Sequence, residues 1–416
     1  MNLLLYSWNA NNEQILADNL RKLGFHVVWF RKECRNYTRD MELAMEMIPF
    51  IHGQQIEAVV SFNYFPIISM ICNTCQIPYY AWVYDCPHFT LYAKQITLPC
   101  NHIGIFDRDM VRHLEDYEVN TIHHVPLAVD TVYFNKLFVQ VSEQDRKKYQ
   151  CDISFVGSLY TGEYNYYDSL FKASAVRAVG DTALQEILQT GQIGMEAAQG
   201  YVGMDDLLSR QCFSYRKDSL KQMVKAGGIH FSVLQTKMEE QGLMLGEDYF
   251  AKAEDILMAA VLEKKVTVEE RRILLTEIIN RKYDFRLYTG SDTKEIPELD
   301  CYNQGTVDYH TQMPLVFAGS RINLNIALRS IHSGIPLRVL DIMACGGFVL
   351  SNWQPEIAEY FAEGEEIVTF DSLSDCLDKI SYYLAHEKER RQIAENGHKK
   401  VQEAFSYKIG LERLFS

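Results

Sequence analysis

The chain has 416 residues, of which 47% are hydrophobic and 23% are charged, as is typical of globular proteins. This composition excludes intrinsic disorder, collagen, coiled coils and small disulfide scaffolds, and the length predicts two or three domains. Asp and Glu number 55 against 41 Lys and Arg, a formal net charge of −14. A duplex nucleic-acid partner is therefore not expected, because its phosphates need a basic surface.

Short apolar runs alternate with helical patterns over the first 125 residues. Strict alternation predicts a parallel sheet with helices on both faces. Pro126 marks the end of this unit, and we assign residues 1–135 to an N-terminal Rossmann-like lobe. The predicted strands are 3–6, 27–30, 58–62, 79–84, 103–106 and 121–125, and the predicted helices are 11–23, 40–52, 67–75 and 109–117.

A second α/β unit follows a polar stretch. It starts with a strand-and-turn pattern at 152–158, and a segment at about 164–282 has almost no strand pattern, which predicts a helical insertion with helical runs at 257–263 and 269–280. We assign residues 150–400 to a C-terminal Rossmann-like lobe that carries this insertion, and 401–416 to a C-terminal helix. Further strands are predicted at 285–289, 321–327, 348–351 and 367–370, with a helical tail from 373.

Two parallel α/β units joined by a short linker place a crevice between the carboxyl ends of their strands, where open α/β sheets bind ligands. The sequence lacks a run of 18 apolar residues, so no integral membrane segment is expected. The start of the chain is also unlike a signal peptide. Ten scattered cysteines without a disulfide framework favour a reducing, cytoplasmic location.

The segment at 329–347, RSIHSGIPLRVLDIMACGG, is the most informative stretch. Ser333 or Gly334 is expected to cap a helix, with Pro336 in its first turn. The free N–H groups and the dipole of a helix N-terminus bind anions. Arg338 and Asp341, three residues apart, share one helix face. They either bind the diphosphate and ribose of a nucleotide or form an exposed surface pair, and spacing alone leaves both open.

The layout and its motifs resemble the GT-B glycosyltransferases. The run LDIMACG at 340–346 is similar to the segment of retaining GT-B enzymes that carries an E-x7-E motif. Asp341 stands where the second, ribose-binding Glu would fall, and Ser333 stands where the first would fall. The chain departs from the motif there, so the stereochemical outcome stays open.

A closer resemblance is to the spore-maturation-protein type of bacterial glycosyltransferases, with a C-terminal lobe like that of the group 1 glycosyl transferases. It rests on SGIPLRVLDIMACGGF at 333–348, AWVYDCP at 81–87, HVPLAVD at 124–130, FVGS at 155–158, YTG at 288–290 and INLN at 322–325. The resemblance implies a metal-independent transfer of a sugar from a nucleotide-sugar, expected to be a UDP-sugar, to a glycan or protein acceptor. No other cofactor is implied.

The resemblance also implies a donor site in the second lobe. Gly157 and Ser158 would contact the donor phosphates, or they simply form a turn. The remaining implied donor-binding residues are Asn325, Arg329, His332, Ser333, Gly334, Arg338 and Asp341.

The first lobe would then hold the acceptor. Asp85 or His88, just after a buried strand, could deprotonate an acceptor hydroxyl as general base, although Asp85 could instead cap a helix. Asn63 and Asn11 are expected to bind the acceptor, and Asn11 could also cap the first helix. No DxD motif lies at a strand end in a way that would hold a divalent metal, and Asp205-Asp206 within the insertion is expected to be a solvated face, so no metal site is predicted.

Two alternative functions remain at this point. A nucleotide-sugar epimerase on the same scaffold would use the donor pocket without an acceptor. A non-catalytic protein that binds a nucleotide-sugar would show no turnover, and Ser333 in place of Glu keeps this alternative open.

Overall fold

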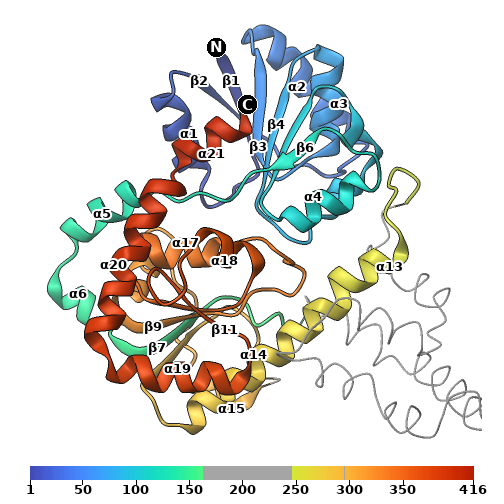
Figure 1. Cartoon of the computed structure of the whole chain (residues 1–416). Coiled ribbons are helices and arrows are strands. Elements are labelled where there is room, and N and C mark those ends of the chain that lie inside the picture. The colour runs from blue at the N-terminus through green and yellow to red at the C-terminus, as the bar shows by residue number, and fades with distance from the viewer. Residues whose placement is uncertain (163–245, 295) are drawn as a thin grey trace, which may run out of the picture.

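The computed structural model describes residues 1–162, 246–294 and 296–416, which form two α/β lobes, each around one parallel sheet (Figure 1). The predicted strands and helices of the first lobe are confirmed, with boundaries shifted by a few residues. Most of the predicted insertion, including Asp205-Asp206, lies outside the described residues.

The first lobe contains a six-stranded sheet in the order β2-β1-β3-β4-β5-β6, with every neighbouring pair parallel. Its strands are buried because helices cover both faces. The strands are β1 (Asn2–Ser7), β2 (His26–Arg31), β3 (Ala58–Phe62), β4 (Tyr79–Val83), β5 (Asn101–Ile105) and β6 (Ile122–His124), and the helices are α1 (Glu13–Lys22), α2 (Met41–Gly53), α3 (Pro66–Cys75), the short η1 (Phe89–Tyr92) and η2 (Lys94–Thr97), and α4 (Arg108–Glu115).

The second lobe contains a five-stranded parallel sheet in the order β11-β10-β9-β7-β8, reached through α5 (Thr131–Gln140) and α6 (Glu143–Lys147). This sheet places the carboxyl ends of β7, β9 and β10 side by side. The strands are β7 (Cys151–Val156), β8 (Phe285–Tyr288), β9 (Ser320–Asn325), β10 (Val349–Asn352) and β11 (Val368–Phe370), and the helices are α15 (Pro297–Asp300), α16 (Met313–Gly319), α17 (Leu337–Ala344), α18 (Pro355–Tyr360), α19 (Leu373–Ala385) and α20 (Glu387–Ala404).

A helical rod spans both lobes and matches the helical runs predicted at 257–263 and 269–280. It consists of α13 (Ala253–Ile256), a π-helical stretch η4 (Leu257–Leu262) and α14 (Glu263–Asn280) (Figure 1). The chain just before it is anchored on the first lobe, where Phe250 N donates to Tyr92 O. Leu274, Leu275 and Ile278 of α14 enter the core of the second lobe.

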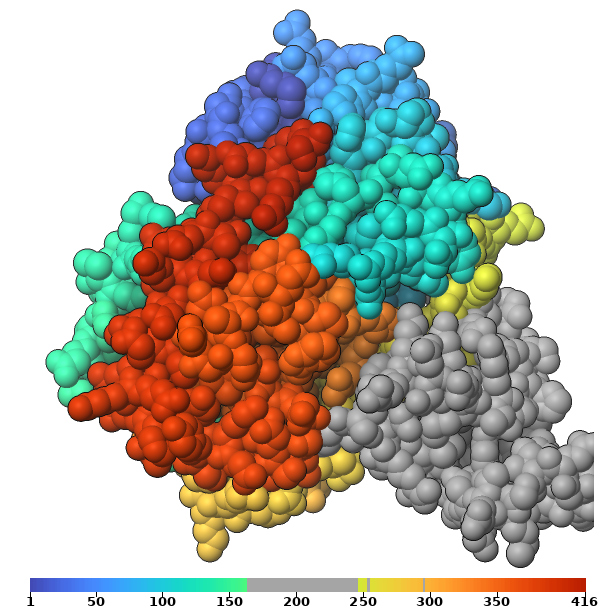
Figure 2. All heavy atoms as spheres, viewed as in Figure 1, coloured from blue at the N-terminus to red at the C-terminus, as the bar shows by residue number. Residues whose placement is uncertain are grey.

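The last helix, α21 (Tyr407–Leu414), returns to the first lobe. Its apolar residues Tyr407, Leu411 and Leu414 pack in the same core as Trp82 of β4. Gly410 makes this contact close, because a Cβ there would lie 2.3 Å from the Trp82 ring. The segment from α20 to α21 therefore runs over both lobes, as the red surface in Figure 2 shows.

Helix α17 differs from the sequence prediction at its start. It begins at Leu337, and Pro336 is its N-cap without a side-chain cap hydrogen bond. The prediction that Ser333 or Gly334 caps this helix was wrong. The Ser333 hydroxyl bonds to Asp107 and Glu356, and Gly334 packs against the first lobe. The predicted end is confirmed: Gly346 has φ +72°, a conformation that favours glycine.

Candidate active site

Arg338 and Asp341 lie on one face of α17, as the spacing predicts. Arg338 Nη1 is 3.2 Å from Asp341 Oδ2, and the guanidinium carbon is 5.5 Å from the centre of the Phe317 ring. The Arg338 side chain is 28% exposed, whereas that of Asp341 is 1% exposed. The alternative of an exposed surface pair is therefore wrong: a buried carboxylate is joined to a cation that solvent still reaches.

The Asp341 carboxylate is connected to the first lobe. Tyr309 donates its hydroxyl to Asp341 Oδ1 at 2.8 Å, and Asn12 Nδ2 donates to the Tyr309 oxygen at 3.1 Å. Beside them, His310 Nε2 lies 2.7 Å from the main-chain oxygen of Asn11. The loop after β1 thus contacts the second lobe through Tyr309 and His310, and Tyr309 links it to Asp341. Asn11 takes part only through its main-chain oxygen, and the residue is exposed.

Buried polar atoms remain unpaired at this junction. Asn12 Oδ1 and His310 Nδ1 are buried and have no hydrogen-bond partner among the described residues. Burial also raises the pKa of Asp341 from 3.8 to about 6, although Arg338 and the Tyr309 hydroxyl both favour its charged form. Unpaired polar atoms and a destabilised carboxylate are typical of a ligand site.

A buried arginine, Arg271, hydrogen-bonds to the main chain of the turn at Gly157 and Ser158, and the sequence alone did not predict this role. Arg271 of α14 donates to the main-chain oxygens of Ser158 and Ile326, and its guanidinium carbon lies 4.9 Å from the centre of the Tyr160 ring. Its Nε has no partner among the described residues.

A sequence signal for Arg271 did exist. Leu274, Leu275 and Ile278 follow it at i+3, i+4 and i+7, so Arg271 occupies a core position of an apolar helical stripe. The Ser158 hydroxyl is itself engaged, 3.1 Å from the hydroxyl of Ser291.

Three other predicted donor residues already have protein partners. Asn325 Nδ2 donates to the Ser351 hydroxyl at 2.9 Å. Arg329 forms two hydrogen bonds, of 2.7 and 2.6 Å, with the Glu270 carboxylate. His332 Nε2 lies 2.9 Å from a carboxylate oxygen of Glu263 on the same helix, α14. Arg329 and His332 thus both have carboxylate partners on α14.

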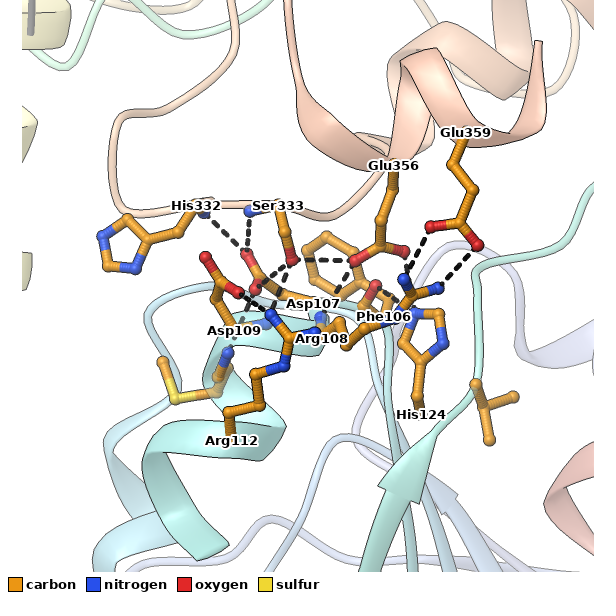
Figure 3. A network of polar contacts seen from close by, with 12 residues as sticks. Phe106, Asp107, Arg108, Asp109, Arg112, His124, His332, Ser333, Glu356 and Glu359 are labelled. Carbon is orange, nitrogen blue, oxygen red and sulfur yellow. Dashed lines mark hydrogen bonds and ion pairs between the residues drawn. The ribbon is translucent and has the colours of Figure 1, made fainter. Parts of the chain in front are cut away.

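Ser333 lies in a polar network between the lobes, which we call the clasp and define as Asp107, His124, Ser333 and Glu356 (Figure 3). Ser333 Oγ is 3.0 Å from Asp107 Oδ1 and 2.8 Å from Glu356 Oε1. His124 Nε2 lies 2.8 Å from Glu356 Oε2. Both carboxylates are 1% exposed. Ser333 therefore joins the second lobe to the first rather than capping a helix.

The two lobes pack closely at Gly334. A Cβ added there would lie 2.8 Å from the Phe106 ring and 2.9 Å from the Phe106 oxygen. Contacts below 3.0 Å are not tolerated by rigid backbone, so only glycine permits this arrangement of the lobes.

The first-lobe candidates lie together after β3 and β4. Asn63 is buried, has φ +60°, and donates from Nδ2 to Asp85 Oδ2 at 2.6 Å. Asp85 is exposed, whereas His88 Nε2 is held 2.7 Å from the Thr90 hydroxyl. His88 and not Asp85 is the N-cap of the short helix η1. Asp85 is thus the more accessible of the two candidate bases.

The described residues contain neither a cluster of metal-ligating side chains nor a membrane-spanning helix. No group of three or more His, Cys, Asp or Glu side chains in that part of the chain could hold a metal ion. In the same residues, no helix has both the length and the apolar character needed to cross a membrane.

Known proteins are similar in sequence to the second lobe and similar in structure to the whole chain. Residues 270–416 match the family described as "Glycosyl transferase-like". An uncharacterized protein of Aquifex aeolicus (strain VF5) is 26% identical over 141 residues, which are 32% of this chain and 35% of that protein. The chain thus matches about a third of the length of this curated relative.

Solved structures extend the similarity to the whole chain. A glycosyltransferase from Rickettsia africae ESF-5 has a TM-score of 0.55 and 10% identity, with 100% of this chain and 97% of that one covered. HepE of Anabaena, in complex with UDP and glucose, has a TM-score of 0.53 and 8% identity, with 100% and 98% covered. The chain therefore has the GT-B fold of glycosyltransferases, and its C-terminal third is similar in sequence to the glycosyl transferase-like family.

Proposed function

We propose that this protein is a metal-independent glycosyltransferase of the spore-maturation type that moves a sugar from a UDP-sugar to a glycan or protein acceptor. The observation that carries the proposal is the buried Asp341 beside the solvent-accessible Arg338 at the start of α17. The fold and the family match of residues 270–416 support the reaction class. Structures of HepE contain UDP or UDP-glucose, which supports the choice of nucleotide.

In the proposed mechanism, α17 receives the donor. Arg338 neutralises the charge that grows on the diphosphate as the glycosidic bond breaks. Asp341 accepts hydrogen bonds from the ribose diol, and Arg271 keeps the Gly157–Ser158 turn in place beneath the phosphates. The unpaired Asn12 Oδ1 and His310 Nδ1 supply further polar contacts at the junction of the lobes.

The acceptor hydroxyl is activated from the first lobe. Asp85 is exposed at the end of β4, and Asn63 fixes one of its carboxylate oxygens at 2.6 Å. The other oxygen takes the proton of the acceptor hydroxyl as it attacks the sugar carbon. His88 is a weaker candidate, because burial lowers its pKa and its Nε2 already contacts the Tyr64 main chain and Thr90.

The decisive experiment is a thermal-shift titration with UDP, GDP, dTDP and CMP. A ligand at one hundred times its dissociation constant adds about 2.7 kcal/mol of stability. We expect a shift with UDP that is lost in Arg338→Ala. Arg321→Ala is the matched control. Arg321 does not belong to α17, and its Nη1 lies 2.8 Å from Asp152 Oδ1, so this variant should keep the UDP shift. An undiminished UDP shift in Arg338→Ala would remove Arg338 from the donor site.

Two further assays separate the transferase from its alternatives. Release of UDP from a UDP-sugar should depend on an added acceptor, whereas an epimerase would convert the donor alone and a binding protein would do neither. Transfer should persist in EDTA. Complete loss of activity in EDTA, with recovery on adding a divalent cation, would refute metal independence.

A further inference from the structure

A cavity of about 470 Å³ opens between the lobes beside the clasp. Its wall in the first lobe is α4, and its wall in the second lobe consists of residues 329–332 and the segment that follows β10. Figure 3 shows Asp109, Arg112 and His332 on this side of the clasp. The volume is within the range of small-ligand sites, which is about 300–1,000 Å³. Because both lobes contribute, the cavity exists only while they are in contact.

Trp353 supplies a flat apolar surface to this cavity. Its side chain is 51% exposed, an unusual amount for so large a residue. Its main-chain N donates to Phe370 O at 2.8 Å, which fixes the residue at the end of the sheet. Among the described residues, its indole has neither a ring contact nor a hydrogen bond. A rigid aromatic ring with an open face is suited to pack against a ligand.

The polar lining of the cavity favours a neutral ligand over an anion. Arg329 and His332 are each paired with a glutamate carboxylate of α14, so a negative group already faces both side chains. Arg112 is 3.1 Å from Asp109 in an exposed pair, and Asp116 adds a second carboxylate. These groups leave no excess of positive charge, yet they offer both donors and acceptors of hydrogen bonds.

A sugar has the matching chemistry. One face of a pyranose ring presents C–H groups that pack on an aromatic ring, while its hydroxyls donate and accept hydrogen bonds in the ring plane. We propose that this cavity is a saccharide-binding subsite, in which Trp353 stacks on a sugar ring and α4 residues such as Asp109 and Arg112 bond to its hydroxyls. The subsite itself does not depend on the proposed function. The identification of its saccharide as part of the acceptor does rest on that function.

The test is a glycan array probed with the labelled full-length protein, followed by calorimetric titration of the strongest saccharide. We expect wild-type binding, about tenfold weaker binding by Trp353→Ala, and binding within about threefold of wild type by Trp353→Phe, which keeps an aromatic face. Arg112→Ala is a second variant at an exposed helix position and should also weaken binding. Tyr382→Ala is the matched control, since Tyr382 is an exposed aromatic residue on α19, stacked on His386.

The outcomes distinguish this inference from the proposed function. A wild-type protein that binds no saccharide on the array, or a Trp353→Ala variant that binds as tightly as wild type, overturns the subsite. The UDP thermal shift is measured on the same variants and should be unchanged, because Trp353 does not contact Arg338 or Asp341. If the wild-type protein shows no thermal shift with UDP, the proposed donor site is refuted. Saccharide binding that depends on Trp353 would still support the subsite.

Discussion

Replacing Asp341 by Asn should make the free protein more stable and the nucleotide complex weaker. Asp341 is 1% exposed, and its pKa is raised from 3.8 to about 6 mainly by burial. The folded protein therefore holds a proton that the unfolded chain releases between about pH 4 and pH 6. Wild-type stability falls as pH rises through this window, and the loss is complete above about pH 6.

The size of the effect follows from the shift. About two pKa units, at 1.36 kcal/mol each, give roughly 3 kcal/mol of destabilisation by the charged carboxylate. Asn has nearly the same shape and can still accept the hydrogen bond of Tyr309. Asp341→Asn should therefore approach roughly 3 kcal/mol more stability than wild type at about pH 8, and match it near pH 4.

The functional cost should appear in the same variant. A carboxylate that accepts hydrogen bonds from a ribose diol contributes about 1.5–3 kcal/mol, so UDP should bind about 10- to 150-fold more weakly to Asp341→Asn. In the wild type, UDP affinity should fall as pH drops below about 6, because protonation removes the charged acceptor. The variant should lack the contribution of Asp341 to this pH dependence.

Thermal unfolding from about pH 4 to pH 8 and UDP calorimetry measure both effects. Asp18→Asn is the control, because Asp18 pairs with Arg21 on the exposed face of α1 and should change stability by less than about 1 kcal/mol. A variant that is less stable than wild type at pH 8 would refute the account of a desolvated carboxylate. Unchanged UDP affinity would refute its contact with the ribose.

The remaining predictions concern the boundary between the lobes. Glu356→Ala should lower the free energy of unfolding, measured by chemical denaturation, by about 2–4 kcal/mol, because it leaves buried donors without an acceptor. Arg108→Ala should lower it by less than about 1 kcal/mol, because the Arg108 side chain forms a partly exposed pair with Glu359. Equal losses in the two variants would contradict the buried clasp. Gly334→Val should increase the radius of gyration in small-angle scattering and reduce transfer, because its Cβ would meet Phe106 at 2.8 Å. An unchanged scattering profile with full activity would show that the lobes need not approach so closely.

The sequence alone determined the two sheets, because local patterns encode them. Buried parallel strands appear as short apolar runs, and helices between them have a 3.6-residue period. The same rule placed Arg338 and Asp341 on one face of α17, since residues three apart on a helix are neighbours whatever the rest of the fold does.

Tertiary structure decided which polar groups meet. Ser333 bonds to Asp107, 226 residues earlier, and Glu356 reaches the same hydroxyl from another helix. It also decided that Arg329 is taken by a glutamate of α14 and that Arg271 supports the Gly157–Ser158 turn. Hydrogen bonds and ion pairs act over a few ångströms in space and leave no period in the chain, so the packing of the lobes, and not the motif, assigns each charged residue its partner.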